Sequence, residues 1–186
     1  MDGGIALRVQ SGALARRRRA FSLIWLNMKT APTIVRLWDY GWLSQDWVEF
    51  PAAPSDAALI QEYVASPAFH TSFLPSDKDE TGIHGPFRAD RIAAVDFLSL
   101  EEPGLEPYLQ SVELSETPGE DEIERAKVLP YLRSSFGGGS QCYVLKADEK
   151  SKDLFHDWGS VLWVFREFLF IGSGRDRLHR FIIGYD

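Results

Sequence analysis

The C-terminal stretch "FLFIGSGRDRLHRFIIGYD", residues 168–186, decides the fold. Its Gly172-Ser173-Gly174 segment separates two apolar runs, a pattern that fits either a phosphate-binding loop or the turn of a β-hairpin. A phosphate loop needs a helix after the turn, so that main-chain amides and the helix dipole converge on the anion. The residues after Gly174 alternate in polarity and contain the run Phe181-Ile182-Ile183, which favours a strand. We therefore predict a hairpin without an anion site.

A two-residue turn at Ser173-Gly174 defines a register for this hairpin. It predicts three cross-strand pairs: Leu169 with Leu178, Glu167 with Arg180, and Phe165 with Ile182. The central pair joins opposite charges inside an apolar ladder, an arrangement that contributes about 0.2–1 kcal/mol.

Working outward, the rest of the chain mixes strands and helices. Residues 33–42 ("TIVRLWDYGW") and 141–147 ("QCYVLKA") are rich in β-branched and aromatic side chains, as strands are. "DAALIQEYVAS" has helical spacing and follows Ser55, a good cap, with Ala58, Leu59, Tyr63 and Val64 as its expected buried residues. A second helix is expected to begin near Pro118. The fold class is therefore α+β: a mostly antiparallel sheet with two or three helices packed on one side and a C-terminal β-hairpin.

Two regions between these elements are harder to assign. Residues 76–90 are polar and broken by glycine and proline, and we interpret them as a loop long enough to hold a functional site. Residues 91–100 ("RIAAVDFLSL") fit helix or strand, and their β-branched and aromatic content favours a strand. We expect residues 31–186 to form a single domain.

Charge is unevenly distributed along the 186 residues, which have a formal net charge of -7. Residues 1–30 hold six of the 20 basic residues and one of the 27 acidic ones, so the remainder carries 14 basic and 26 acidic residues. An acidic domain disfavours binding to nucleic acid, because that requires a cationic surface. The same surface suits a protein partner, and a basic one in particular.

The basic N-terminal extension, residues 1–30, has three interpretations. It is a targeting segment, a part of the fold, or sequence upstream of a true start at Met28 rather than Met1. Its Arg16–Arg19 cluster precedes a short apolar run that is followed closely by Lys29 and lacks an Ala-x-Ala cleavage site. We favour the start at Met28.

The chain has one cysteine, Cys142, so no disulfide can form within it. No stretch approaches the roughly 18 apolar residues of a membrane span. We therefore expect a cytoplasmic protein without a membrane partner.

The histidines His70, His84, His156 and His179 are scattered, without metal-ligand spacing. We predict no catalytic set, no metal and no cofactor. Two charged groups are instead predicted to contribute to binding: the acids at the start of the second helix and the arginines near the hairpin turn. These residues are Glu120, Asp121, Glu122, Arg175 and Arg177.

Two segments, "SSFGGGSQCYVLKAD" (residues 134–148) and "WVFREFLF" (residues 163–170), together resemble the SUKH superfamily. Its α+β domains have a glycine-containing turn, an aromatic-bearing strand and a later aromatic-x-Glu-Phe-Leu segment. This chain departs from the pattern in the short spacing between Tyr143 and Phe168 and in a predicted strand where the family has a helix. The resemblance implies a bacterial immunity-type protein that binds and blocks a toxin without catalysis.

Three hypotheses for function remain open. The first is a non-catalytic protein-binding domain, of the immunity type. The second is a small hydrolase-like enzyme whose site combines dispersed carboxylates with His84 or His156. The third is an acidic regulator of a nucleic-acid-binding protein.

Overall fold

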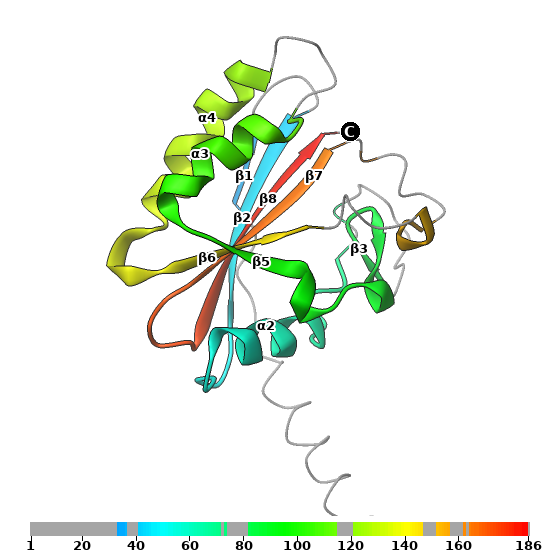
Figure 1. Ribbon diagram of the computed structural model, residues 1–186. Helices are drawn as coiled ribbons and strands as arrows, with labels where there is room; N and C mark the ends of the chain where they lie inside the picture. Colours follow the sequence, from blue (N-terminus) through cyan, green and yellow to red (C-terminus); the bar gives the residue numbers. More distant parts are fainter. Residues whose placement is uncertain are drawn as a thin grey trace, which may run out of the picture. The chain divides into compact units, whose positions relative to one another are not determined.

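The computed structural model describes residues 33–36, 41–71, 73, 82–114, 121–146, 152–156, 162 and 164–185. The main feature is a six-stranded sheet with the order β1-β2-β8-β7-β6-β5, in which all neighbours are antiparallel (Figure 1). The strands are β1 (Thr33–Arg36), β2 (Gly41–Glu49), β5 (Phe97–Leu100), β6 (Gln141–Leu145), β7 (Val164–Ile171) and β8 (Arg177–Tyr185).

Helices and short elements cover this sheet. The helices are α2 (Asp56–Val64), α3 (Glu102–Ser111) and α4 (Asp121–Ser134). A separate small hairpin pairs β3 (Ile83–His84) with β4 (Phe87–Arg88). Single 3-10 turns are η2 (Ala89–Arg91), η3 (Ala94–Asp96), η4 (Gly137–Gly139) and η5 (Lys152–Leu154). The α+β class, the antiparallel sheet and the C-terminal hairpin are confirmed.

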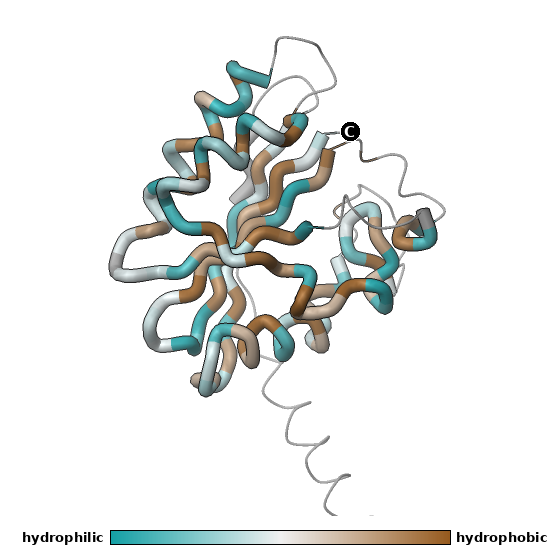
Figure 2. The backbone as a smooth tube through the Cα atoms, viewed as in Figure 1, coloured by the Kyte–Doolittle hydropathy of each residue, from teal (hydrophilic) through white to brown (hydrophobic). Residues whose placement is uncertain are grey.

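The side chains of the central strands alternate between two faces of the sheet. One face packs against α3 and α4, and we call it the apolar face. The other face lies under α2 and the β3–β4 hairpin, and we call it the network face. Two helices thus share one side, as expected, and α2 lies on the other. Figure 2 shows hydrophobic residues along the central strands and hydrophilic ones gathered on α3 and α4.

The apolar face has a core of large, fully buried side chains. Phe168 and Phe170 of β7 and Phe181 of β8 pack edge-to-face with aromatic neighbours. Ridges of both helices cover them, and the buried helical residues are Leu105, Leu109, Val128 and Leu132. Burial of this kind contributes roughly 1.5–3 kcal/mol for each large side chain.

The β7–β8 hairpin forms, but the predicted register is wrong by two residues, a shift that keeps each side chain on the same face of the sheet. Glu167 lies opposite Ile182, and Leu169 lies opposite Arg180. Ser173 and Gly174 do lie inside the turn closed by the Arg175 amide and the Gly172 carbonyl, at 3.0 Å. The strand pair nearest the turn is Ile171 with Leu178, so the connection is longer than the predicted two residues. Residues 175 and 176 do not join the ladder, because Arg175 has a positive φ of 49° and the carbonyls of both residues accept hydrogen bonds from the amides of Ala53 and Phe50.

Helix α2 follows the expected local rules. Ser55 caps it, with its hydroxyl accepting from the amide of Ala58 at 3.2 Å. Its buried residues are Leu59, Ile60 and Tyr63. Ala58 and Val64 are only partly buried, so the helix turns a slightly different side to the sheet than predicted.

Other expectations need correction. The single strand expected over residues 33–42 is divided between two antiparallel strands, β1 and β2. Residues 91–100 form a strand only from Phe97 onward, after two 3-10 turns. The supposed loop over 76–90 contains the β3–β4 hairpin. Helix α3 was not expected, because its acidic stretch of sequence offers only Leu105 and Leu109 as buried positions.

The expectations for residues 1–30, including the start at Met28, fall outside the described residues. None of the helices in the described ranges is both long and apolar enough for a membrane crossing.

Candidate functional site

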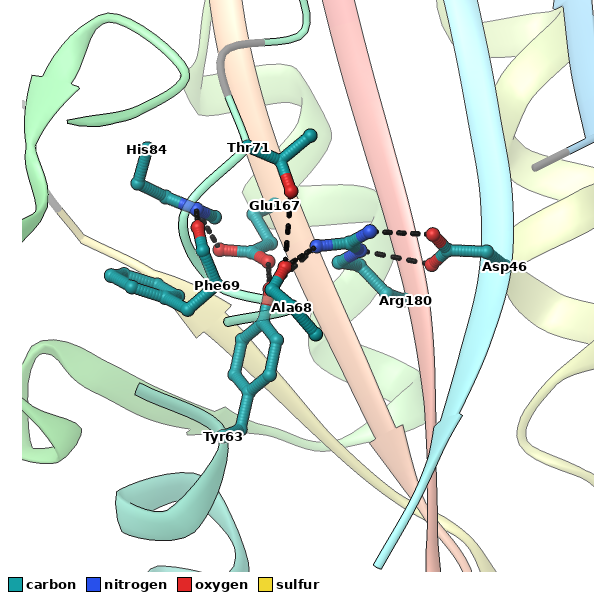
Figure 3. Close-up of polar contacts among 8 residues, drawn as sticks. All are labelled: Asp46, Tyr63, Ala68, Phe69, Thr71, His84, Glu167 and Arg180. Carbon is teal, nitrogen blue, oxygen red and sulfur yellow. Dashed lines mark hydrogen bonds and ion pairs between the residues drawn. The ribbon is translucent and has the colours of Figure 1, made fainter. Parts of the chain in front are cut away.

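A chain of five polar side chains lies buried on the network face (Figure 3). Three come from adjacent strands, where the two-residue repeat points them the same way: Asp46, Arg180 and Glu167. The fourth, Tyr63, comes from α2, and the fifth, His84, comes from β3. Elements distant in sequence therefore meet through polar contacts.

Arg180 and Asp46 form one end of the chain. They are cross-strand partners, and the guanidinium binds the carboxylate with two parallel hydrogen bonds, one of them from Nε to Oδ1 at 2.9 Å. The remaining nitrogen, Nη1, donates to the Ala68 carbonyl at 2.8 Å and to the Tyr63 hydroxyl at 3.1 Å. Burial alone would lower the pKa of Arg180, but Tyr63, Asp46 and Glu167 together raise it. Arg180 is thus a permanent buried cation.

Tyr63 links the two halves of the chain. Its hydroxyl accepts from Arg180 and donates to Glu167 Oε1 at 2.6 Å. Burial first, and then the Glu167 charge, raise the pKa of Tyr63 well above its ordinary value, although Arg180 opposes this. The phenol therefore stays protonated and keeps its donor role.

His84 and Glu167 form the other end. Nε2 of His84 lies 2.8 Å from Glu167 Oε2, and Nδ1 lies 2.6 Å from the Phe69 carbonyl oxygen. Burial would raise the pKa of Glu167, but His84, Arg180 and Tyr63 outweigh it and lower that pKa. Because a carbonyl oxygen can only accept, Nδ1 of His84 donates to Phe69, and the other ring nitrogen lies against the Glu167 carboxylate.

The polar side chains of the network are paired with one another and lie against aromatic rings. The Asp46 carboxylate binds the Arg180 guanidinium, and the Glu167 carboxylate lies beside His84. The His84 ring stacks on Phe69 with centroids 3.8 Å apart, and the Phe73 ring lies 5.1 Å from the Arg180 guanidinium carbon. Buried charges are tolerated when they are paired and hydrogen-bonded in this way.

Water does not reach the His84–Glu167 pair, whose side chains are both 0% exposed. A general acid or base must come within hydrogen-bond distance of its substrate. Here both nitrogens of His84 and both oxygens of Glu167 bind protein groups instead. In the structure described, the network joins α2, β3 and the sheet, and neither His84 nor Glu167 has a polar atom available to an external substrate.

The two histidine candidates have different hydrogen-bond partners. His84 joins the network, whereas His156 Nε2 lies 3.0 Å from the Gly85 carbonyl. Within the described residues, no three His, Cys, Asp or Glu side chains are grouped closely enough to hold a metal ion.

The predicted binding residues are not brought together with one another. Asp121 accepts from the Leu114 amide at 2.7 Å and so helps to begin α4, and Glu122 is exposed in the same turn. Arg175 pairs with Asp56 at 2.6 Å, and Arg177 pairs with Glu49 at 2.7 Å. Glu120 lies outside the described residues.

Asp46 was missed from the sequence, and Glu167 and Arg180 were noticed only as a presumed cross-strand pair. A signal for all three exists: each is a single charge at an inward position of an apolar, alternating strand. Such charges are rare in cores unless they are paired.

Comparison with models of known protein families, with curated proteins and with solved structures gave no significant match.

Proposed function

We propose that this chain is a non-catalytic protein-binding domain. The observation that carries the proposal is the sealed, internally satisfied network of Asp46, Tyr63, Glu167, His84 and Arg180. The acid–base groups of this network bind one another and stabilise the fold. We therefore assign the function to the surface of the domain.

The surface has features that suit a protein partner. Beyond residue 30 the chain carries an excess of 12 acidic residues, which favours a basic partner through steering and complementarity. Large apolar side chains are also exposed, and apolar groups at the surface are a common component of binding sites. They are Trp47, Val95, Leu98, Ile123, Tyr131 and Phe155.

We further propose that the binding is of the immunity type, in a bacterial cytoplasm. This part rests on the resemblance of residues 134–148 and 163–170 to the SUKH superfamily. An immunity protein acts by stoichiometric binding, so it needs a rigid domain and no active site. A charge network that ties α2, β3 and three strands together provides such rigidity.

The test uses the purified full chain and the purified products of the genes that flank its own. Isothermal titration calorimetry is expected to show a complex with a Kd below about 1 μM. If the partner is a toxic enzyme, its activity should fall linearly with added chain and reach zero at equal molar amounts. Catalytic turnover by the purified chain, or inhibition at far less than equal molar amounts, contradicts the proposal.

A hydrolase-like enzyme is the second candidate, and the 2.8 Å contact of His84 with Glu167 favours it. Hydrolysis by His84 and Glu167 would require α2 or the β3–β4 hairpin to move away from them, because both side chains are buried. A screen with chromogenic ester and phosphoester substrates tests it. Turnover that His84→Gln abolishes, in a variant shown to be folded by circular dichroism, supports the enzyme and overturns the binding domain.

A further inference from the structure

Strand β5 stands at the end of the sheet and has β6 as its one neighbour among the described strands. Figure 1 shows it joining the segment before it to α3, next to β6. An edge strand of this kind is a template for another extended chain unless it is covered or blunted.

One contact shows which residues of β5 direct their main-chain groups toward β6 and which direct them away. The Lys146 amide donates to the Asp96 carbonyl at 2.9 Å, so the main chain of residue 96 faces β6. In an antiparallel ladder the direction alternates, and the main chains of Phe97 and Ser99 therefore face away from β6. The Phe97 amide already donates to Ala94 within η3.

Three main-chain groups thus point to the open side: the Phe97 carbonyl, the Ser99 amide and the Ser99 carbonyl. None of them bonds to another strand in the part of the chain that the structure describes. An extended segment that presents a donor, an acceptor and a donor fits this row.

The side chains along the same edge are apolar and exposed. Val95 is 82% exposed and Leu98 is 43% exposed, whereas Phe97, on the network face, is buried. A strand added beside β5 would place its own apolar side chain against Leu98. The edge therefore offers both a hydrogen-bond row and an apolar contact.

Charge defines one end of this edge. Glu101 and Glu102 are exposed directly after Leu100, while Glu106 is already paired with Arg133. The basic residues Arg91 and Lys146 lie toward the other end. A strand that runs antiparallel to β5 starts beside Glu101 and Glu102, so a Lys or Arg at its N-terminal end complements them.

A second copy of this chain is the other occupant to test. Two β5 strands paired antiparallel about a two-fold axis would bring Glu101 and Glu102 of each copy toward the end of the other strand, where Asp96 lies beside the basic Lys146. That end carries both signs of charge, so the oligomeric state of the purified chain separates the two occupants.

We propose that the free edge of β5 binds an extended segment of the protein partner, antiparallel to β5, with a Lys or Arg at the N-terminal end and an apolar residue beside Leu98. Main-chain pairing supplies affinity, and the two flanking side-chain contacts supply specificity. This inference rests on the proposed function, since it names where and how that partner binds.

Two substitutions at Ser99 distinguish loss of main-chain pairing with the partner segment from loss of the serine side chain. Ser99→Pro removes the outward amide, and it leaves the bonds between β5 and β6 in place because those involve residues 98 and 100. Ser99→Ala is the matched control: like the proline variant it loses the hydroxyl that accepts from Gln141, but it keeps the amide.

The probe is a displayed library of random peptides of about 10 residues, the upper length of ordinary strands, selected against the full chain. Selected peptides should alternate in polarity and carry Lys or Arg near the N-terminal end. By fluorescence polarisation they should bind wild type and Ser99→Ala alike and Ser99→Pro about tenfold more weakly.

Circular dichroism and thermal unfolding show whether Ser99→Pro folds. If it does not fold, the double variant Glu101→Lys/Glu102→Lys tests the inference, and Glu113→Lys/Asp153→Lys is a control of equal charge change at other exposed acids. Basic peptides should lose affinity for the first double variant and keep it for the second.

Failure to select any peptide, equal binding to Ser99→Pro, equal loss in both double variants, or dimerisation through β5 overturns the inference. A complex with a whole partner protein that folded Ser99→Pro leaves intact also overturns it, while the proposed function stands. Turnover by the chain overturns the proposed function instead.

Discussion

The two faces of the sheet use the same strands and opposite chemistry. On the apolar face, β7 and β8 place Phe168, Phe170 and Phe181 under α3 and α4. On the network face the intervening positions are Glu167 and Arg180, under α2 and β3. Burial of apolar area is non-directional and tolerates small shifts, whereas paired charges require one geometry. The difference teaches that α3 and α4 are held mainly by buried apolar area, whereas α2 and β3 add paired polar contacts of fixed geometry to their own apolar burial.

The largest effect should follow from breaking the charge pair. Arg180→Ala leaves the Asp46 carboxylate buried and unpaired, which costs about 3–5 kcal/mol of unfolding free energy. Urea denaturation measures it. The double variant Asp46→Leu/Arg180→Met removes both charges and should recover most of the loss. If the single variant costs under about 1 kcal/mol, the network face is not held by this pair.

A smaller effect should follow from removing the linking hydroxyl. Tyr63→Phe deprives Glu167 of a donor and Arg180 of an acceptor, at a cost of about 1–3 kcal/mol. Tyr143→Phe is the control: its hydroxyl donates to Asp56 at 3.0 Å in a more exposed place, and its loss should cost about 0.5–1.5 kcal/mol. Equal losses in the two variants would show that burial does not strengthen the network.

Acid should weaken the network face selectively. The pKa of Glu167 is lowered by folding, so its contribution is complete above about pH 4.3, the ordinary value for glutamate, and is lost as the pH falls through its folded pKa. The stability difference between wild type and Glu167→Gln should therefore shrink below that pH. A difference that stays constant down to pH 2.5 argues against an ionised Glu167.

His179 should also make the folded state less stable as the pH falls, but in a higher pH range than Glu167. Burial, and then the charge of Arg177, lower the pKa of His179, so the stability it permits is present above about pH 6.5 and declines as the pH falls through its folded pKa. His179→Gln separates this window from that of Glu167, because it should remove only the part of the decline just below pH 6.5.

The smallest effect is expected at Cys142, which lies fully buried on the apolar face. Burial raises the pKa of its thiol, so the reactive thiolate is scarce at neutral pH. Reaction with a thiol reagent should follow global unfolding and become immediate in denaturant. Labelling at the rate of a free thiol in native buffer would mean that α3 and α4 open locally.

Local patterns were enough to predict the hairpin, the α2 cap and the strand at 141–145, because each depends on neighbouring residues. The register of the hairpin was not predictable in this way, because the main chain of residues 175 and 176 bonds to the β2–α2 connection. Helix α3 was hidden for a similar reason: Leu105 and Leu109 have meaning only against the aromatic core that they cover.

The candidate site was less visible than the fold. Tyr63 was recognised as buried and His84 as part of a long loop, but nothing in the chain places Asp46 beside Arg180 until β2 pairs with β8. Sequence periodicity alone predicted two hairpin strands with Glu167 and Arg180 among apolar residues, and composition showed the acidic character. Only the tertiary structure decided which charges meet. Their attraction acts over a few ångströms, and the strand order that brings them that close is settled by packing across the whole sheet.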